Sequence, residues 1–325
     1  MIPLSIDSKK SIITWRDFGQ YHTYEGRFSQ ATKAQFGITE KILGKAPNEC
    51  QTPLSLLNQA NFDGVDPSVF IFHVSRCGST LLTRALAQSR NNLVYGEPVV
   101  INQLWNHFLG DKPATLTSPF NQQETTLFTN LLRALGRKRL DSHTHYAIKF
   151  SSLYCLIMDQ ISKLYPQTPI LFIYRDPIEV LVSVSQKNYG FVDDHQSELS
   201  QAAINSNAPV NDSKDAYSAK LLEIKMQHAI RSTHPKLHYL NYSQLTKENL
   251  PKILETIGIN FNTEDLQSMQ NQFDFYSKSD YKTQHFENDS NIKRQQASEE
   301  LQSLCEPTLN NLYQELLNSD KNINN

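Results

Sequence analysis

The sequence predicts an α/β fold in which helices cover both faces of a central parallel sheet, a three-layer arrangement. Short apolar runs that are rich in β-branched and aromatic residues predict buried strands. A turn and then apolar residues at helical spacing follow these runs, and strands that alternate with helices are typical of a parallel sheet. The runs that predict strands are 69–73, 93–95, 146–149, 170–174 and 237–240.

Length and composition restrict the classes of protein that fit. The chain has 325 residues, enough for one large core, and its formal net charge is −2. We therefore expect no strong field for nucleic acid or for a membrane surface. No run of 18 apolar residues occurs, so we expect no membrane-spanning helix, and the first ten residues lack the pattern of a secretory signal. The four cysteines are far apart, which favours free thiols in a reducing compartment, the cytoplasm.

The predicted core domain covers residues 66–318. Residues 1–65 lack a clear hydrophobic period and are predicted to be an N-terminal extension packed on this core. Residues 188–213 are polar and predict a lid or an acceptor-binding loop, with an unstructured insertion as the alternative. Residues 319–325 are expected to form a flexible tail.

The turn 75–80 follows the strand 69–73 and leads directly into a helix. The amides of such a turn and the N-terminus of its helix favour an anion, and Gly78 allows the backbone to approach it closely. In the nucleotide triphosphatase loop a lysine follows the second glycine, but here Ser79 takes that place. Arg76 supplies the cation instead, so the sequence predicts a different kind of phosphate site.

A second anion motif follows the strand 170–174. Asp176 can cap the next helix, and Pro177 suits its first turn. Ser183 stands eight residues after Arg175, two helical turns further on. A guanidinium at a strand end and a hydroxyl at that spacing can converge on one phosphate.

Two further charged residues end strands of the predicted sheet. Glu97 follows the strand 93–95, and Lys149 ends the strand 146–149. Because the carboxyl ends of parallel strands meet at one edge, both should face the same crevice. A buried lysine is costly unless it meets an anion, and a carboxylate can take a proton from an attacking hydroxyl. The alternatives are a solvated turn carboxylate and a lysine that reaches past the sheet edge into water.

The two anion motifs resemble those of sulfotransferases that use 3′-phosphoadenosine 5′-phosphosulfate (PAPS). The turn 75–80 is similar to their 5′-phosphosulfate loop, and the strand followed by Arg175, Asp176, Pro177 and Ser183 is similar to their 3′-phosphate motif. The pattern is nearest to the tyrosylprotein sulfotransferases. The resemblance extends from residue 69 to about residue 318 and implies a P-loop-type fold.

The resemblance also implies roles for individual residues in in-line transfer of a sulfuryl group to a hydroxyl or amine acceptor. Glu97 would take the acceptor proton, and Lys149 and Arg76 would stabilise the transferred group. The proline that the family carries two residues after this lysine is absent; Phe150 and Ser151 follow Lys149. The implied donor-binding residues are Arg76, Cys77, Gly78, Ser79, Thr80, Arg175, Ser183, Lys187, Tyr242 and either Lys293 or Arg294. PAPS is the implied co-substrate, and no metal is implied.

Two other functions remain open from the sequence. A P-loop kinase or nucleotide hydrolase could use Asp176 as a magnesium carboxylate, although Ser79 stands where its loop lysine belongs. A protein of the same fold could also bind PAPS, or its product adenosine 3′,5′-bisphosphate (PAP), without catalysis. The sequence specifies neither the acceptor nor the oligomeric state.

Overall fold

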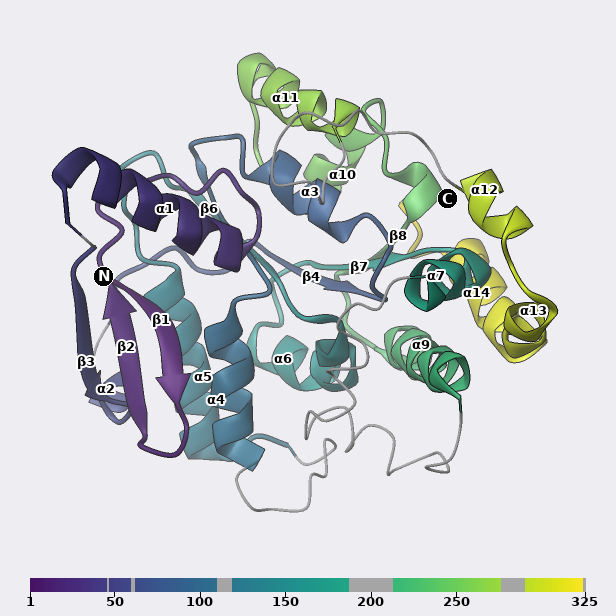
Figure 1. Ribbon diagram of the computed structural model, residues 1–325, viewed down its shortest axis with the longest axis horizontal. Coiled ribbons are helices and arrows are strands. Elements are labelled where there is room, and N and C mark those ends of the chain that lie inside the picture. Colours follow the sequence, from purple (N-terminus) through teal and green to yellow (C-terminus); the bar gives the residue numbers. More distant parts are fainter. Residues whose placement is uncertain (46, 60–61, 110–118, 187–212, 276–289, 324–325) are drawn as a thin grey trace.

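A parallel sheet of five strands forms the centre of the computed structural model, which describes all residues except 46, 60–61, 110–118, 187–212, 276–289 and 324–325 (Figure 1). The spatial order of the strands is β5-β6-β4-β7-β8. Their bounds are β4 Val69–His73, β5 Asn92–Gly96, β6 His145–Lys149, β7 Ile170–Tyr174 and β8 Leu237–Asn241. The predicted α/β architecture with a parallel sheet is confirmed.

Strand β4 lies in the middle of this sheet. It pairs with β6 on one side, where Phe70 opposes Ile148, and with β7 on the other, where Phe72 opposes Phe172. All five residues of β4 are buried, because helices cover both faces of the sheet. This burial explains why the strand is an unbroken apolar run rather than an alternating one.

Helices form the outer layers. In Figure 1 the helices α3 (Ser79–Leu86), α10 (Leu250–Thr256) and α11 (Thr263–Gln270) lie above the sheet. Helices α4 (Val99–Leu109), α5 (Gln122–Leu135), α6 (Met158–Leu164) and α9 (Lys214–Arg231) lie below it. Helix α7 (Pro177–Ser185) contacts α9, α12 (Ser290–Gln295) and α13 (Glu299–Cys305).

The N-terminal residues contain a second, antiparallel sheet. Strands β1 (Ile2–Asp7), β2 (Ile12–Arg16) and β3 (Glu49–Pro53) form it in the order β1-β2-β3. Helix α1 (Phe28–Leu43) lies between β2 and β3 in the chain, and α2 (Leu56–Gln59) follows β3. Strand β1 contacts α4 and α5, so this sheet packs against the core domain. Only β2 alternates in burial, and a single alternating strand was too weak a pattern to predict the sheet.

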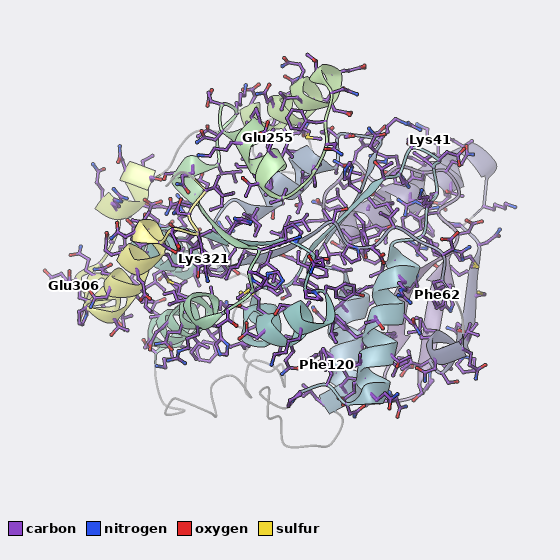
Figure 2. The ribbon with its side chains drawn as sticks, turned by 180° about the vertical axis from the view of Figure 1, so that it is seen from behind. Lys41, Phe62, Phe120, Glu255, Glu306 and Lys321 are labelled. Atoms are coloured by element: carbon purple, nitrogen blue, oxygen red, sulfur yellow. The ribbon has the colours of Figure 1, made fainter. Side chains whose placement is uncertain are left out.

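An aromatic cluster fixes α4 against α5. The ring of Phe120, which is labelled in Figure 2, lies 5.4 Å from the ring of Trp105 between their centroids. Phe120 also contacts Phe128 of α5. Helix α4 begins at Val99, two residues after Glu97. The packing of α4 therefore also fixes the turn that carries Glu97.

The chain after β6 forms a 3₁₀ helix, Ser152–Ile157, which is followed by α6. Near the C-terminus, α13 and α14 (Thr308–Asn318) lie on either side of Pro307. Shorter 3₁₀ helices cover Tyr242–Gln244 and Asn271–Asp274.

Residues 319–323 pack against β8, whereas the sequence predicted a flexible tail from residue 319. The amide of Tyr239 donates to the carbonyl of Lys321 (2.9 Å), and the amide of Ile323 donates to the carbonyl of Tyr239 (3.1 Å). The side chain of Asn322 is buried and donates to the hydroxyl of Tyr174 (2.8 Å). Figure 2 labels Lys321 in this segment. The segment is polar, and its composition therefore predicted a flexible tail. Asn322 is nevertheless buried, because its side chain forms a hydrogen bond with the buried hydroxyl of Tyr174.

All four cysteines are free thiols, as the sequence predicted, and Cys50 is the exposed one. No helix in the described part of the chain combines the length and the apolar character that crossing a membrane requires.

Candidate active site

The predicted site residues lie at one edge of the central sheet. Glu97, Arg175 and Tyr242 directly follow the last residues of β5, β7 and β8, and Lys149 is the last residue of β6. The phosphate loop (residues 75–80) follows β4. In parallel α/β sheets, ligands bind beyond the carboxyl ends of the strands, at the point where the order of the strands reverses. The topology therefore brings residues from five strands to one place.

The phosphate loop has an unusual backbone that suits an anion. Ser75, Arg76 and Gly78 have positive φ angles of 74°, 54° and 80°. Helix α3 begins after Gly78 without a side-chain cap, so its first amides can serve an anion. A Cβ at position 78 would lie 2.9 Å from Cδ2 of Tyr242 and 2.9 Å from Cδ2 of Leu245. Both the backbone angle and the lack of space require glycine here.

The two anion motifs adjoin each other. Nε of Arg76 donates to Oγ of Ser183 (2.6 Å), and Nη1 of Arg175 donates to the backbone carbonyl of Arg76 (3.2 Å). The guanidinium of Arg175 also lies 3.9 Å from the ring centroid of Tyr242, the ring that borders Gly78. Arg76 and Arg175 are thus in direct contact. Ser183 contacts Arg76 here, although the sequence associated it with Arg175.

A buried carboxylate holds Arg175 in place. Nε of Arg175 lies 2.6 Å from Oε2 of Glu179, whose side chain is only 3% exposed. Oγ of Ser290 donates to the same oxygen (2.9 Å) and accepts from Nη2 of Arg175 (3.3 Å). Arg294 lies 3.1 Å from Oε1 of Glu179 and 2.8 Å from Oδ2 of Asp176. The sequence analysis missed Glu179 and Ser290; for Glu179 the spacing of four residues from Arg175 was the available signal.

Lys149 connects Glu97 to the phosphate loop. Its side chain is fully buried, and Nζ lies 2.8 Å from Oε1 of Glu97 and 3.3 Å from Oγ1 of Thr80. Burial alone would raise the pKa of Glu97, but the charge of Lys149 and the neighbouring ring of His73 outweigh burial and hold that pKa well below its usual range. Glu97 is therefore ionised at neutral pH. Its φ of 54° is rare for a residue other than glycine, and strained backbone concentrates at functional sites.

The remaining predicted residues lie around this centre or outside the described part. Lys293 is buried on α12, and the neighbouring Arg294 takes part in the Glu179 cluster. Lys187 and most of the predicted lid, 188–213, lie outside the described residues. Ser213, which is described, caps α9.

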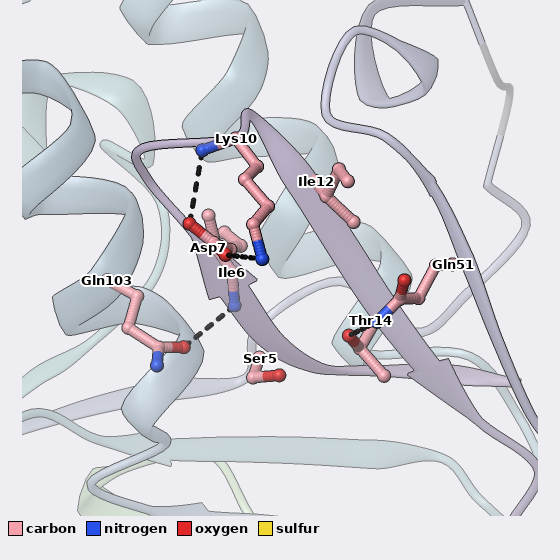
Figure 3. A pocket seen from close by; sticks show the side chains of 8 residues that line it. All are labelled: Ser5, Ile6, Asp7, Lys10, Ile12, Thr14, Gln51 and Gln103. Carbon is pink, nitrogen blue, oxygen red and sulfur yellow. Dashed lines mark hydrogen bonds and ion pairs between the residues drawn. The ribbon is translucent and has the colours of Figure 1, made fainter.

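A separate hollow lies between the N-terminal sheet and α4 (Figure 3). It has a volume of 320 Å³, and none of its lining residues is a predicted site residue. Gln103 lines it and accepts a hydrogen bond from the amide of Ile6 (2.8 Å), which ties β1 to α4. Its polar walls belong to the packing of the N-terminal sheet.

No group of three or more His, Cys, Asp or Glu side chains in the described ranges is arranged to hold a metal ion.

Comparisons with known proteins give structural similarity only. No family model matches the chain, and no curated protein matches it by sequence. The sulfotransferase STF9 from Mycobacterium avium is similar at a TM-score of 0.45 and 10% identity, over 88% of this chain and 85% of that one. A sulfotransferase from Alicyclobacillus acidocaldarius is similar at a TM-score of 0.43 and 12% identity, over 78% of this chain and 97% of that one. Mouse sulfotransferase SULT7A1, complexed with PAP, is similar at a TM-score of 0.35 and 16% identity, over 82% of this chain and 89% of that one.

Proposed function

We propose that the protein transfers a sulfuryl group from PAPS to the hydroxyl or amine of an acceptor. One observation carries the proposal: Arg76 and Arg175 adjoin at the same sheet edge as the Glu97–Lys149 pair, with 3.2 Å between Nη1 of Arg175 and the carbonyl of Arg76. Two anion sites beside an ionised carboxylate suit a donor that carries phosphate at two positions and an acceptor that must lose a proton.

The residues fit such a donor. The uncapped N-terminus of α3, the crowded Gly78 and the side chain of Arg76 suit the 5′-phosphosulfate. Arg175 suits the 3′-phosphate, because Glu179 and the ring of Tyr242 hold its planar guanidinium in place at this edge of the sheet. Ser183, Lys187, and Lys293 or Arg294 complete the proposed donor site.

The proposed chemistry requires one proton acceptor and stabilisation of negative charge. The acceptor oxygen or nitrogen forms a bond to sulfur while the bond from sulfur to the phosphate oxygen breaks. Glu97 takes the acceptor proton, and PAP leaves with the bonding electrons. Lys149 and the loop amides stabilise charge on the sulfuryl oxygens and on the leaving phosphate, which is the larger part of catalysis in such transfers.

Calorimetric titration tests the donor. We expect PAP to bind more tightly than ATP, and Arg175→Met to weaken PAP at least tenfold, since a charge-assisted contact contributes about 1.5–3 kcal/mol. Equal or tighter binding of ATP with magnesium would favour a kinase or nucleotide hydrolase instead.

Mass spectrometry of an acceptor panel incubated with labelled PAPS tests the transfer. We expect Glu97→Gln to bind PAP like the wild type and to lose at least a hundredfold in turnover, because general base catalysis typically contributes 10²–10⁴-fold. Glu255→Gln is the matched control, since Glu255 is exposed on α10 (Figure 2). Unchanged turnover of Glu97→Gln would remove Glu97 as the base, and binding without any transfer by the wild type would indicate a PAP-binding protein.

A further inference from the structure

His73 lies between the phosphate loop and Glu97. It is the last residue of β4 and is 3% exposed. The amide of Ser75 donates to its Nδ1 at 3.0 Å. A ring nitrogen that accepts a hydrogen bond carries no proton, so the proton of this imidazole lies on Nε2.

Nε2 of His73 lies 3.4 Å from Oε1 of Glu97. The same oxygen is 2.8 Å from Nζ of Lys149. In the described part of the chain, Oε2 of Glu97 has no hydrogen bond or ion pair. A contact of 3.4 Å is long for a hydrogen bond, and contacts in ligand-free sites commonly shorten when the substrate binds. One carboxylate oxygen thus contacts Lys149 and faces Nε2 of His73, and the other oxygen is available to an acceptor.

The charges around the pair keep the imidazole neutral and the carboxylate ionised. Burial is the main cause that lowers the pKa of His73 to about 4. Lys149 and Lys225 face the imidazole and lower that pKa further, whereas Glu97 raises it. Lys149, His73 and Arg27 face Glu97 and keep its pKa low.

We propose that His73 is a positioning residue that connects the turn of the phosphate loop at Ser75 to Oε1 of Glu97, so that Oε2 faces the acceptor. The inference rests on the proposed function, in which Glu97 is the base. The amide of Ser75 in the loop holds Nδ1, and Nε2–H orients the carboxylate. The position of the base therefore depends on the state of the donor loop.

Two substitutions separate the two contacts. In His73→Asn the amide oxygen takes the place of Nδ1 and keeps the Ser75 contact, but no donor reaches Glu97. In His73→Gln the amide nitrogen takes the place of Nε2 and keeps the Glu97 contact, but the Ser75 contact is lost. The measurements are the pH profile of kcat/KM and the Kd of PAP.

We expect opposite patterns. His73→Asn should move the acid limb of the profile up by about one pH unit, since a hydrogen bond to a charged group contributes about 1.5 kcal/mol, and should leave the Kd of PAP unchanged. His73→Gln should leave the acid limb in place and raise the Kd of PAP several-fold. Equal effects of both substitutions on both measurements would overturn the proposal.

His234 provides a matched control. Its Nδ1 also accepts the amide two residues later, that of Lys236, at 3.2 Å. It is also buried, but it precedes the first residue of β8, whereas His73 is the last residue of β4. The two histidines therefore lie at opposite ends of the parallel strands. His234→Asn and His234→Gln should change neither the acid limb nor the Kd of PAP.

Nitrogen-15 NMR of the histidines tests the contact without any activity. We expect the His73 resonance, assigned by its loss in His73→Asn, to show a neutral ring with the proton on Nε2 from pH 8 to about pH 5, and to change in Glu97→Gln. A proton on Nδ1, a charged ring at neutral pH, or no response to Glu97→Gln would overturn the inference. Absence of transfer by the wild type would refute the proposed function instead, and the NMR result would still decide whether His73 contacts Glu97.

Discussion

Substitution of Gly96 by alanine tests how closely the N-terminal segment lies against the strand that carries Glu97. Gly96 ends β5, and a Cβ added to it would lie 2.3 Å from the carbonyl oxygen of Gly26 and 3.4 Å from Cα of Arg27. Real Cβ atoms essentially never come closer than 3.0 Å to such an atom, so the two backbones must separate by about 0.7 Å. Backbone atoms on both sides cannot move aside as a flexible side chain can. Overpacking of this kind costs about 1–3 kcal/mol.

Gly37→Ala is the control for this prediction. Gly37 lies inside α1, and a Cβ there would have nothing within 4 Å. Alanine is about 0.5–1 kcal/mol better than glycine in a helix interior, so the control should be more stable than the wild type. The same chemical change should therefore have opposite effects at the two positions.

Urea unfolding of the wild type and both variants measures the difference. We expect Gly96→Ala to lower the midpoint, Gly37→Ala to raise it, and the slope to stay constant in both. Because the shift displaces Glu97, kcat/KM of Gly96→Ala should also fall while the Kd of PAP stays constant. A Gly96→Ala variant as stable as the wild type would refute the close approach of the two segments.

Three further predictions follow from the site and the buried histidines. Gly78→Ala should raise the Kd of PAP at least tenfold, because the added Cβ would lie 2.9 Å from the ring of Tyr242 and the φ angle of this residue is 80°. Calorimetry measures this Kd, and an unchanged value would contradict the loop geometry. Arg175→Lys should weaken the binding of PAP, because an ammonium lacks the planar fork of donors with which a guanidinium can bind a carboxylate and a phosphate together. An affinity for PAP equal to that of the wild type would contradict the role of the guanidinium. Stability should fall as the pH falls from 7.5 to 5, because burial lowers the pKa of His73 to about 4 and of His143 to about 3, so that only the unfolded chain binds these protons. Each histidine should contribute about 2 kcal/mol of this loss, and His143→Asn should reduce the dependence in urea unfolding at the two pH values.

Local patterns predicted the central sheet well. All five strands were visible because a strand buried on both faces is an apolar run, and the turns that follow them were visible from Gly78 and Pro177. The N-terminal sheet was not predicted, because of the neighbouring strands β1 and β2 only β2 alternates in burial, and β3 pairs across a long stretch of chain, as Cys50 does with Trp15. The packed C-terminal segment was missed for the same reason, since its partner Tyr174 is distant in sequence.

The candidate site could be predicted only in part. The positions of Glu97, Lys149 and Arg175 followed from the rule that strand ends meet at one edge. The pairing of Arg175 with Ser290 and the placement of His73 against Glu97 depend on side-chain directions, which residue spacing does not determine.

The segment 319–323 has a consequence for the association of this protein with other chains. It bonds to Tyr239 of β8, the outermost strand on that side of the sheet, and so occupies backbone groups that would otherwise be open. An open outer strand is a template for strand addition by another molecule. A chain shortened to end at Asn318 would present such a strand, and it should form higher-order species at concentrations where the full chain does not.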